Sequence, residues 1–121
     1  MYSNKNNRVL FGKDAWGPPK WKQLHLCAIN YPDYPTHDEI TKKYQEIMRI
    51  IQELPCPECR GHALKYIRND PPNLINSQTL QIWVWDFHNR VNARLKKPFF
   101  NYSEYERMYD PYFRRTGRRN A

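Results

Sequence analysis

Residues 54–62 read Leu-Pro-Cys-Pro-Glu-Cys-Arg-Gly-His, and this stretch holds two of the three cysteines of the chain. Proline is well tolerated at the first position of a helix, because the N–H that it lacks would have no partner there. We therefore expect Cys56 at or just before a helix start and Cys59 in the first turn. Backbone N–H groups and the helix dipole favour a thiolate at that place, which makes a cysteine reactive. The pattern indicates a redox-active disulfide rather than a structural one.

The segment that leads into these cysteines has the pattern of an amphipathic helix. Thr36 followed by Glu39 has the form of a capping box, in which each side chain accepts a hydrogen bond from the other residue's backbone N–H. Apolar residues then recur with helical spacing at Ile40, Tyr44, Ile47, Ile51 and Leu54. Lysine, arginine, glutamine and glutamate occupy positions between them, so we expect this helix to pack one face on a core.

Two further helices are predicted over residues 56–68 and 77–96. The sequence Asn69-Asp70-Pro71-Pro72 would end the first, because proline cannot continue a helix, and Ser77 can cap the second. The core stripe of the second helix comprises Leu80, Val84, Phe87, Val91 and Leu95. Another face gathers polar side chains beside an aromatic ring, at Trp85, His88, Asn89 and Asn92. Such a face indicates a ligand or a partner helix.

An irregular arm is expected over residues 1–13, before the first helix. The sequence Trp16-Gly17-Pro18-Pro19 marks the entry to that helix, which we expect to end near Ile29. Trp21 and His25 are four residues apart and therefore lie one turn apart on the same face.

The end of the chain predicts one more, shorter helix. Ser103 with Glu106 is a second capping-box match, and the helix would end near Tyr109. Four substantial helices, one short helix and tight loops predict an all-α fold, a four-helix bundle with a short fifth helix. We expect one domain over residues 14–110 and a basic tail over residues 111–121.

Composition narrows the functional classes. The net charge is +8, and part of the excess lies in Arg114-Arg115-Thr116-Gly117-Arg118-Arg119. No nucleic-acid-binding module accompanies this charge, so a solvated tail is favoured over nucleic-acid binding. No apolar run is long enough to span a membrane, and residues 1–8 lack the apolar stretch of a secretory signal. An odd number of cysteines argues against a disulfide-stapled secreted domain.

Four motifs follow one another along the chain: Trp21-x-x-x-His25, Tyr31-Pro-Asp, Leu-Pro-Cys56-x-x-Cys59 and His88-Asn89-x-Val91-Asn92-x-x-Leu95-x-Lys97-Pro98. Together they resemble the Erv/ALR family of FAD-linked sulfhydryl oxidases, over residues 14–105 and in the family's order and spacing. The form Leu-Pro-Cys-Pro-x-Cys-Arg-x-His-Ala looks most like the short members encoded by large DNA viruses. The resemblance implies a four-helix bundle that holds FAD in its mouth and is usually dimeric.

The resemblance also implies the residues of the site. By matching position, those that would contact FAD are Gly17, Trp21, His25, Cys59, His62, His88, Asn89, Val91, Asn92, Leu95 and Lys97. Aromatic and imidazole rings would pack on the adenine and the flavin, and the lysine would meet phosphate charge. The catalytic pair would be Cys56 and Cys59.

The activity implied is the oxidation of protein dithiols. A substrate thiol would attack Cys56, and two electrons would pass from Cys59 to FAD and then to O₂, which gives H₂O₂. The chain lacks the second cysteine pair with which longer members shuttle electrons. Substrates would therefore reach Cys56 directly, or a separate thioredoxin-like or CxxC shuttle protein would deliver the electrons.

Other interpretations stay open at this point. Cys56, Cys59 and His62 could belong to a structural zinc site, and a non-enzymatic helical adaptor could carry an inert CxxC. Cys27 has no counterpart in the family pattern, and we expect a buried core thiol. Trp83 and Trp85, taken singly, are assigned to the core. The viral form of the motif favours the cytoplasm of an infected host cell or a virion, with the mitochondrial intermembrane space as the alternative.

Overall fold

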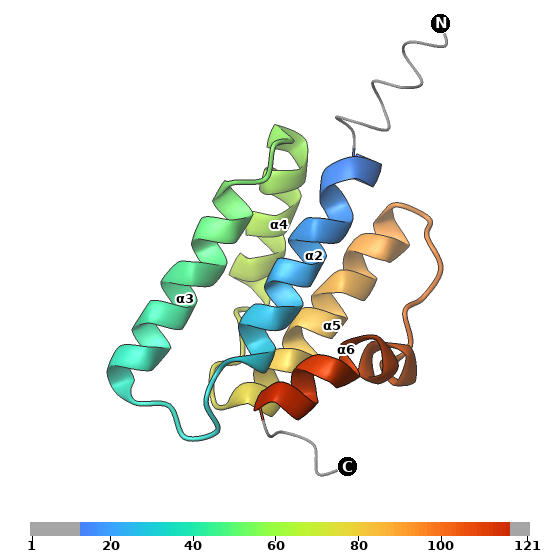
Figure 1. Cartoon of the computed structure of the whole chain (residues 1–121). Coiled ribbons are helices and arrows are strands. Elements are labelled where there is room, and N and C mark those ends of the chain that lie inside the picture. The colour runs from blue at the N-terminus through green and yellow to red at the C-terminus, as the bar shows by residue number, and fades with distance from the viewer. Residues whose placement is uncertain (1–12, 117–121) are drawn as a thin grey trace, which may run out of the picture.

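The computed structural model describes residues 13–116, and all its regular elements are helices. In chain order these are α2 (Lys13–Ile29), α3 (His37–Gln52), α4 (Pro57–Asn69), α5 (Ser77–Arg94) and α6 (Tyr102–Thr116). Helices α2 to α5 stand side by side, and α6 lies across the lower end of α2 and α5 in the view of Figure 1. The predicted all-α four-helix bundle with a fifth helix is confirmed.

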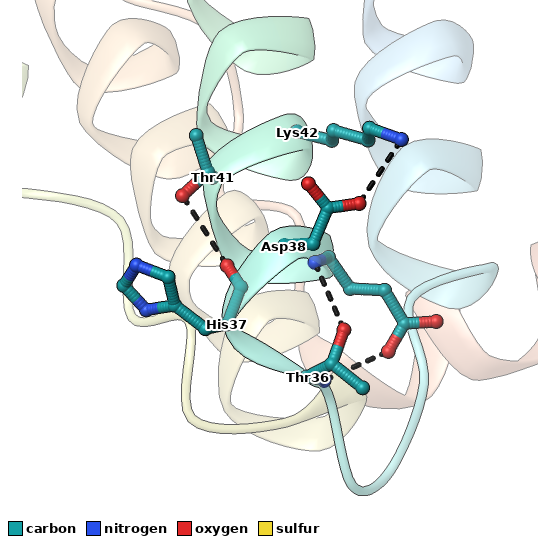
Figure 2. Close-up of polar contacts among 6 residues, drawn as sticks. Thr36, His37, Asp38, Thr41 and Lys42 are labelled. Carbon is teal, nitrogen blue, oxygen red and sulfur yellow. Dashed lines mark hydrogen bonds and ion pairs between the residues drawn. The ribbon is translucent and has the colours of Figure 1, made fainter.

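The start of α3 is fixed by the capping box that the sequence predicts. The Glu39 N–H donates to Thr36 Oγ1 at 3.1 Å, and the Thr36 N–H donates to Glu39 Oε1 at 2.8 Å (Figure 2). An exposed ion pair between Asp38 and Lys42, 3.0 Å long, follows one turn later. The two capping-box bonds satisfy N–H groups that a helix start leaves without partners.

The inner face of α3 packs on the bundle core. Ile47, Ile50 and Ile51 are each at most 1% exposed, whereas the Tyr44 side chain is 41% exposed. The predicted stripe is therefore wrong at Tyr44 and right at Ile47 and Ile51, and the buried face also includes Ile50, which was not predicted.

Polar side chains tie the elements together at one end of the bundle. The Ser77 hydroxyl donates to the Ala28 carbonyl at 2.8 Å, and the Tyr31 hydroxyl donates to the Leu74 carbonyl at 2.6 Å. Ser77 is therefore not the N-cap of α5; Asn76 is, through a reciprocal pair of hydrogen bonds with Thr79. The predicted cap was wrong because Ser77 is 1% exposed and its hydroxyl is used between helices.

The first helix begins earlier than the sequence predicts. Helix α2 already starts at Lys13, so Pro18 and Pro19 lie inside it rather than at its entry. Proline has no N–H to donate to the carbonyl four residues earlier. The first part of α2 is helical despite these missing bonds.

The last helix is longer than predicted. Helix α6 runs on to Thr116, and Phe113 is 1% exposed in a second core cluster with Ile29, Tyr105 and Tyr109. The predicted end near Tyr109 is wrong, because an aromatic stripe with helical spacing continues beneath the arginines. The capping pair is also different: Asn101 and Glu104 exchange the reciprocal bonds, at 2.9 and 3.0 Å, that were predicted for Ser103 and Glu106.

Among residues 13–116, no helix has both the length and the apolar character needed to cross a membrane.

Candidate active site

A cavity of about 700 Å³ opens between α2, α4, α5 and the loop that follows α5. Its size is within the range of ordinary cofactor sites. Many of the predicted site residues line it: Gly17, Trp21, Cys59, His62, His88, Val91, Asn92, Leu95 and Lys97. The fold thus brings residues from distant parts of the sequence to one wall.

The cysteine pair lies at the start of α4, beside this cavity. Cys56 is the N-cap residue, and its Sγ accepts a hydrogen bond from the Cys59 N–H at 3.1 Å. Pro57 occupies the first helical position, as predicted. Cys59 is 9% exposed and lines the cavity, whereas Cys56 is more exposed and does not. One sulfur therefore faces the interior site, and the other is accessible from outside.

A stack of rings forms another part of the cavity lining. Trp21 and His88 lie parallel, with ring centroids 3.9 Å apart and 7° between their planes. His25 lies behind them, and its Nε2 is 3.0 Å from His88 Nδ1. Flat, parallel surfaces of this kind suit a flat heteroaromatic ligand.

Both histidines are held neutral. Burial, and to a smaller extent the nearby His88, lowers the pKa of His25 to about 3. Burial also lowers the pKa of His88 to about 4, with Lys97 as a second cause. His25 Nδ1 is buried and has no hydrogen-bond partner within the described residues. A buried polar atom without a partner is costly.

Positive charge surrounds the cavity. The basic residues that line it are Lys20, Lys65, Arg90, Arg94 and Lys97, and Glu104 is the acidic residue among its lining. Lysine and arginine side chains bind phosphate groups. A ligand that joins flat rings to a diphosphate fits this combination of ring stack and cations, and FAD is such a ligand.

Three predicted residues are not part of the cavity lining. Cys56 lies outside it, and His25 lies behind His88. Asn89 is 9% exposed, and its side-chain amide is bonded to the backbone of Phe100. The contact of His25 and Asn89 with FAD stays a prediction, as does the catalytic role of Cys56.

Several lining residues were not singled out from the sequence, among them Trp16, Tyr66, Phe87, Phe99, Phe100 and Tyr109. Phe87 had been assigned to the core stripe of its helix, and it does pack there as well as on the cavity. Phe99 and Phe100 lie outside any helix, so no periodicity marks them. An aromatic pair directly after Pro98 is the one signal that could have drawn attention to this loop.

The tryptophans beside this face differ from each other. Trp83 is buried and belongs to the core as predicted. Trp85 is half-buried and donates its indole N–H to the Phe100 carbonyl at 2.7 Å.

The zinc alternative finds no support in the geometry. Across residues 13–116, no group of three or more histidine, cysteine, aspartate or glutamate side chains is arranged to hold a metal ion. His62 instead faces Glu58, with Nε2 and Oε2 3.9 Å apart.

Comparisons with known proteins agree with this site. The model of the Erv1 / Alr family matches residues 19–110. An FAD-linked sulfhydryl oxidase of African swine fever virus (isolate Pig/Kenya/KEN-50/1950) is 43% identical over 95 residues, 78% of this chain and 80% of the relative. The mitochondrial FAD-linked sulfhydryl oxidase ERV1 of Saccharomyces cerevisiae is 32% identical over 94 residues, 77% of this chain and 49% of the relative.

The fold comparison gives the same family. The crystal structure of the yeast Erv1 core superposes with a TM-score of 0.74 at 30% identity, covering 79% of this chain and 81% of that one. The FAD binding domain of Erv1 from Saccharomyces cerevisiae gives a TM-score of 0.70 at 32% identity, covering 75% and 87%. With its bundle, its cysteine pair and its ring-lined cavity, the chain belongs to the Erv1 / Alr family.

Proposed function

We propose that this FAD-dependent thiol oxidase takes electrons from protein dithiols at Cys56 and delivers them through Cys59 to FAD in the cavity. The observation that carries the proposal is the placement of the two sulfurs. Cys59 lines the cavity and is 9% exposed, whereas Cys56, at the helix start, is accessible from outside. The pair thus connects an external substrate with an internal site.

The thiol exchange needs only the two cysteines and the substrate. A substrate thiolate attacks Cys56 Sγ of the Cys56–Cys59 disulfide, the S–S bond breaks, and Cys59 leaves as a thiolate. The second substrate thiolate then attacks the mixed disulfide at the substrate sulfur, and Cys56 is released. The substrate loses two electrons and two protons, and the cysteine pair gains both.

The local structure favours the release of Cys56 in the second exchange. The Cys59 N–H already donates to Cys56 Sγ, and the start of α4 carries the positive end of the helix dipole. Both features stabilise negative charge on Cys56 when it is the leaving sulfur. Bound FAD supplies the two-electron acceptor and the reaction with O₂ that yields H₂O₂, while the protein positions sulfur against ring.

The chain's own residues account for binding. We assign the flat part of the ligand to the wall made by Trp21 and His88, and the diphosphate to the cations at Lys20, Arg94 and Lys97. Because both histidines are neutral, they add no positive charge next to the rings.

We further propose protein dithiols as substrates, a separate CxxC or thioredoxin-like protein as an electron shuttle, and a homodimer as the working form. The viral relatives support a role in the cytoplasm of an infected cell or in a virion. The mitochondrial yeast relative supports the intermembrane space as the alternative.

The test compares Cys59→Ser with Cys27→Ser in purified protein, by absorption spectroscopy and by oxygen uptake after addition of dithiothreitol. Wild type and Cys27→Ser should show flavin bands, oxygen consumption and peroxide. Cys59→Ser should keep the flavin bands, while its oxygen consumption falls to background, because no second sulfur can carry electrons to the cavity. Sustained thiol oxidation by Cys59→Ser, or a wild-type protein that stays colourless with added FAD, would refute the proposal.

A further inference from the structure

Asn89 lies on α5 beside the ring wall, but its side chain is committed to another part of the chain. The Phe100 N–H donates to Asn89 Oδ1 at 2.7 Å, and Asn89 Nδ2 donates to the Phe100 carbonyl at 2.8 Å. The Trp85 indole N–H donates to the same carbonyl at 2.7 Å. Both ends of the Asn89 amide are thus used by the backbone of one residue eleven positions later.

Phe100 is a wall residue of the cavity. Its ring centroid lies 5.1 Å from that of His88 and 6.0 Å from that of His25. It therefore packs on both histidines, while Trp21 stacks on His88. Fixing the Phe100 backbone fixes this ring and, through it, the orientation of the histidine pair.

The loop that carries Phe100 has few other means of holding its shape. It follows Lys96, which has a positive φ of 60°, and it contains Pro98, which has no N–H. Asn92 supplies two further anchors: its carbonyl accepts from the Lys97 N–H at 2.8 Å, and its Nδ2 donates to the Pro98 carbonyl at 3.3 Å. The Phe100 backbone itself is bonded by Asn89 and Trp85, and Asn101, which caps α6, follows it.

We propose that Asn89 is a positioning residue that retains FAD by holding the Phe100 ring against His88 and His25, and not by contacting FAD itself. The inference rests on the proposed function, since it assigns FAD to this cavity. Without the amide, the arrangement in which the Phe100 ring packs on the histidines becomes one of several. The apparent affinity for FAD then falls in proportion to the fraction of molecules that keep this arrangement.

The experiment measures the rate of FAD release from the diluted holoprotein, by the rise of free-flavin fluorescence. Asn89→Ala, Phe100→Ala and the double variant are compared with wild type. Asn89→Ala should release FAD about tenfold faster or more, since two buried hydrogen bonds are lost. The double variant should release FAD no faster than the faster single variant, because Asn89 acts through the Phe100 ring.

Asn76→Ala is the matched control. It removes an asparagine side chain from the same helix that also bonds a backbone N–H, but at the end remote from the cavity lining. It should lower the thermal midpoint comparably and leave FAD release within about twofold of wild type.

Two results would overturn the inference: FAD release by Asn89→Ala that equals that of Asn76→Ala, or a double variant whose effect is the product of the single effects. The second result would indicate that Asn89 contacts FAD independently. If Asn89→Ala does not fold, Trp85→Phe removes the other donor to the Phe100 carbonyl and should accelerate release in the same direction. A wild-type protein that binds no flavin would contradict the proposed function itself. Failure of the proposed function can therefore be told apart from failure of this inference.

Discussion

The protein contains cysteines in two contrasting surroundings. Cys56 caps α4, where its Sγ accepts a hydrogen bond from the Cys59 N–H and the residue is partly exposed. Cys27 is 5% exposed between α2 and α3, where burial raises the pKa of its thiol to about 12 despite the nearby Lys43 ammonium. Lys43 also forms an ion pair with Glu46 at 2.8 Å and donates a hydrogen bond to the Cys27 carbonyl at 3.0 Å.

The contrast shows that burial outweighs a single charge. A cation favours a thiolate, but desolvation is the larger cause at Cys27, and Glu46 opposes the cation. At the start of α4 a backbone N–H bonds to Cys56 Sγ, at a position that is only half-buried. The expected buried core thiol at Cys27 is confirmed.

Selective alkylation should give the largest difference between the two surroundings. In the reduced protein, iodoacetamide should modify Cys27 about a thousandfold more slowly than an ordinary cysteine, because a pKa near 12 leaves about a thousandfold less thiolate. Mass spectrometry of peptides after short labelling times measures each site. In urea, Cys27 and Cys56 should react alike, and equal rates in the native protein would remove the contrast.

Acidification extends the comparison to the buried histidines. Burial keeps Cys27 protonated, but it keeps His25 and His88 deprotonated, with pKa values of about 3 and about 4 against an ordinary 6.5. The unfolded chain takes up these protons first. Stability is therefore complete above about pH 6.5 and falls as the pH drops toward 4, by up to about 1.4 kcal/mol per pH unit for each histidine.

Urea unfolding between pH 7.5 and 4.5 measures this slope. His88→Gln should show a smaller slope than wild type, because one of the two histidines no longer titrates. Identical slopes in the two proteins would show that other groups control the acid response.

Removing the buried thiol should give the smallest effect. Cys27→Ala should lower the free energy of unfolding by about 1 kcal/mol, since it deletes one buried atom from a packed core. Oxygen uptake per bound flavin should be unchanged. Loss of uptake at undiminished stability would assign Cys27 a part in catalysis and so end the distinction between the two surroundings.

Features that depend on local sequence were predictable. The capping box of α3, the place of Cys56 at a helix start, and the shared face of Trp21 and His25 all follow from residues at most four positions apart. The aromatic stripe of α6 could also have been read, but the arginines around Phe113 have the composition of a tail. The aromatic spacing predicts a helix there and the arginines predict a tail, and the burial of Phe113 extends the helix.

The cavity wall was only partly predictable. Its motif residues are recognisable from the sequence. The bonds between the Asn89 side chain and the backbone of Phe100 are not, because neither residue type predicts a bond across eleven positions. Ser77 shows the same limit, because a serine just before a helical stripe looks like a cap whether or not another helix uses its hydroxyl. Such bonds belong to the tertiary structure.

The two prolines inside α2 give the cavity walls unequal local stability. Pro18 and Pro19 cannot donate to the carbonyls of residues 14 and 15, so the first turns of α2 lack two of their backbone hydrogen bonds. Gly17 and Pro18 line the cavity at this point, whereas α5 faces it with an uninterrupted helix. In a hydrogen-exchange experiment, the amides before Trp21 should lose protection well before those of α5, so that this wall opens by fraying while the rest of the bundle stays folded.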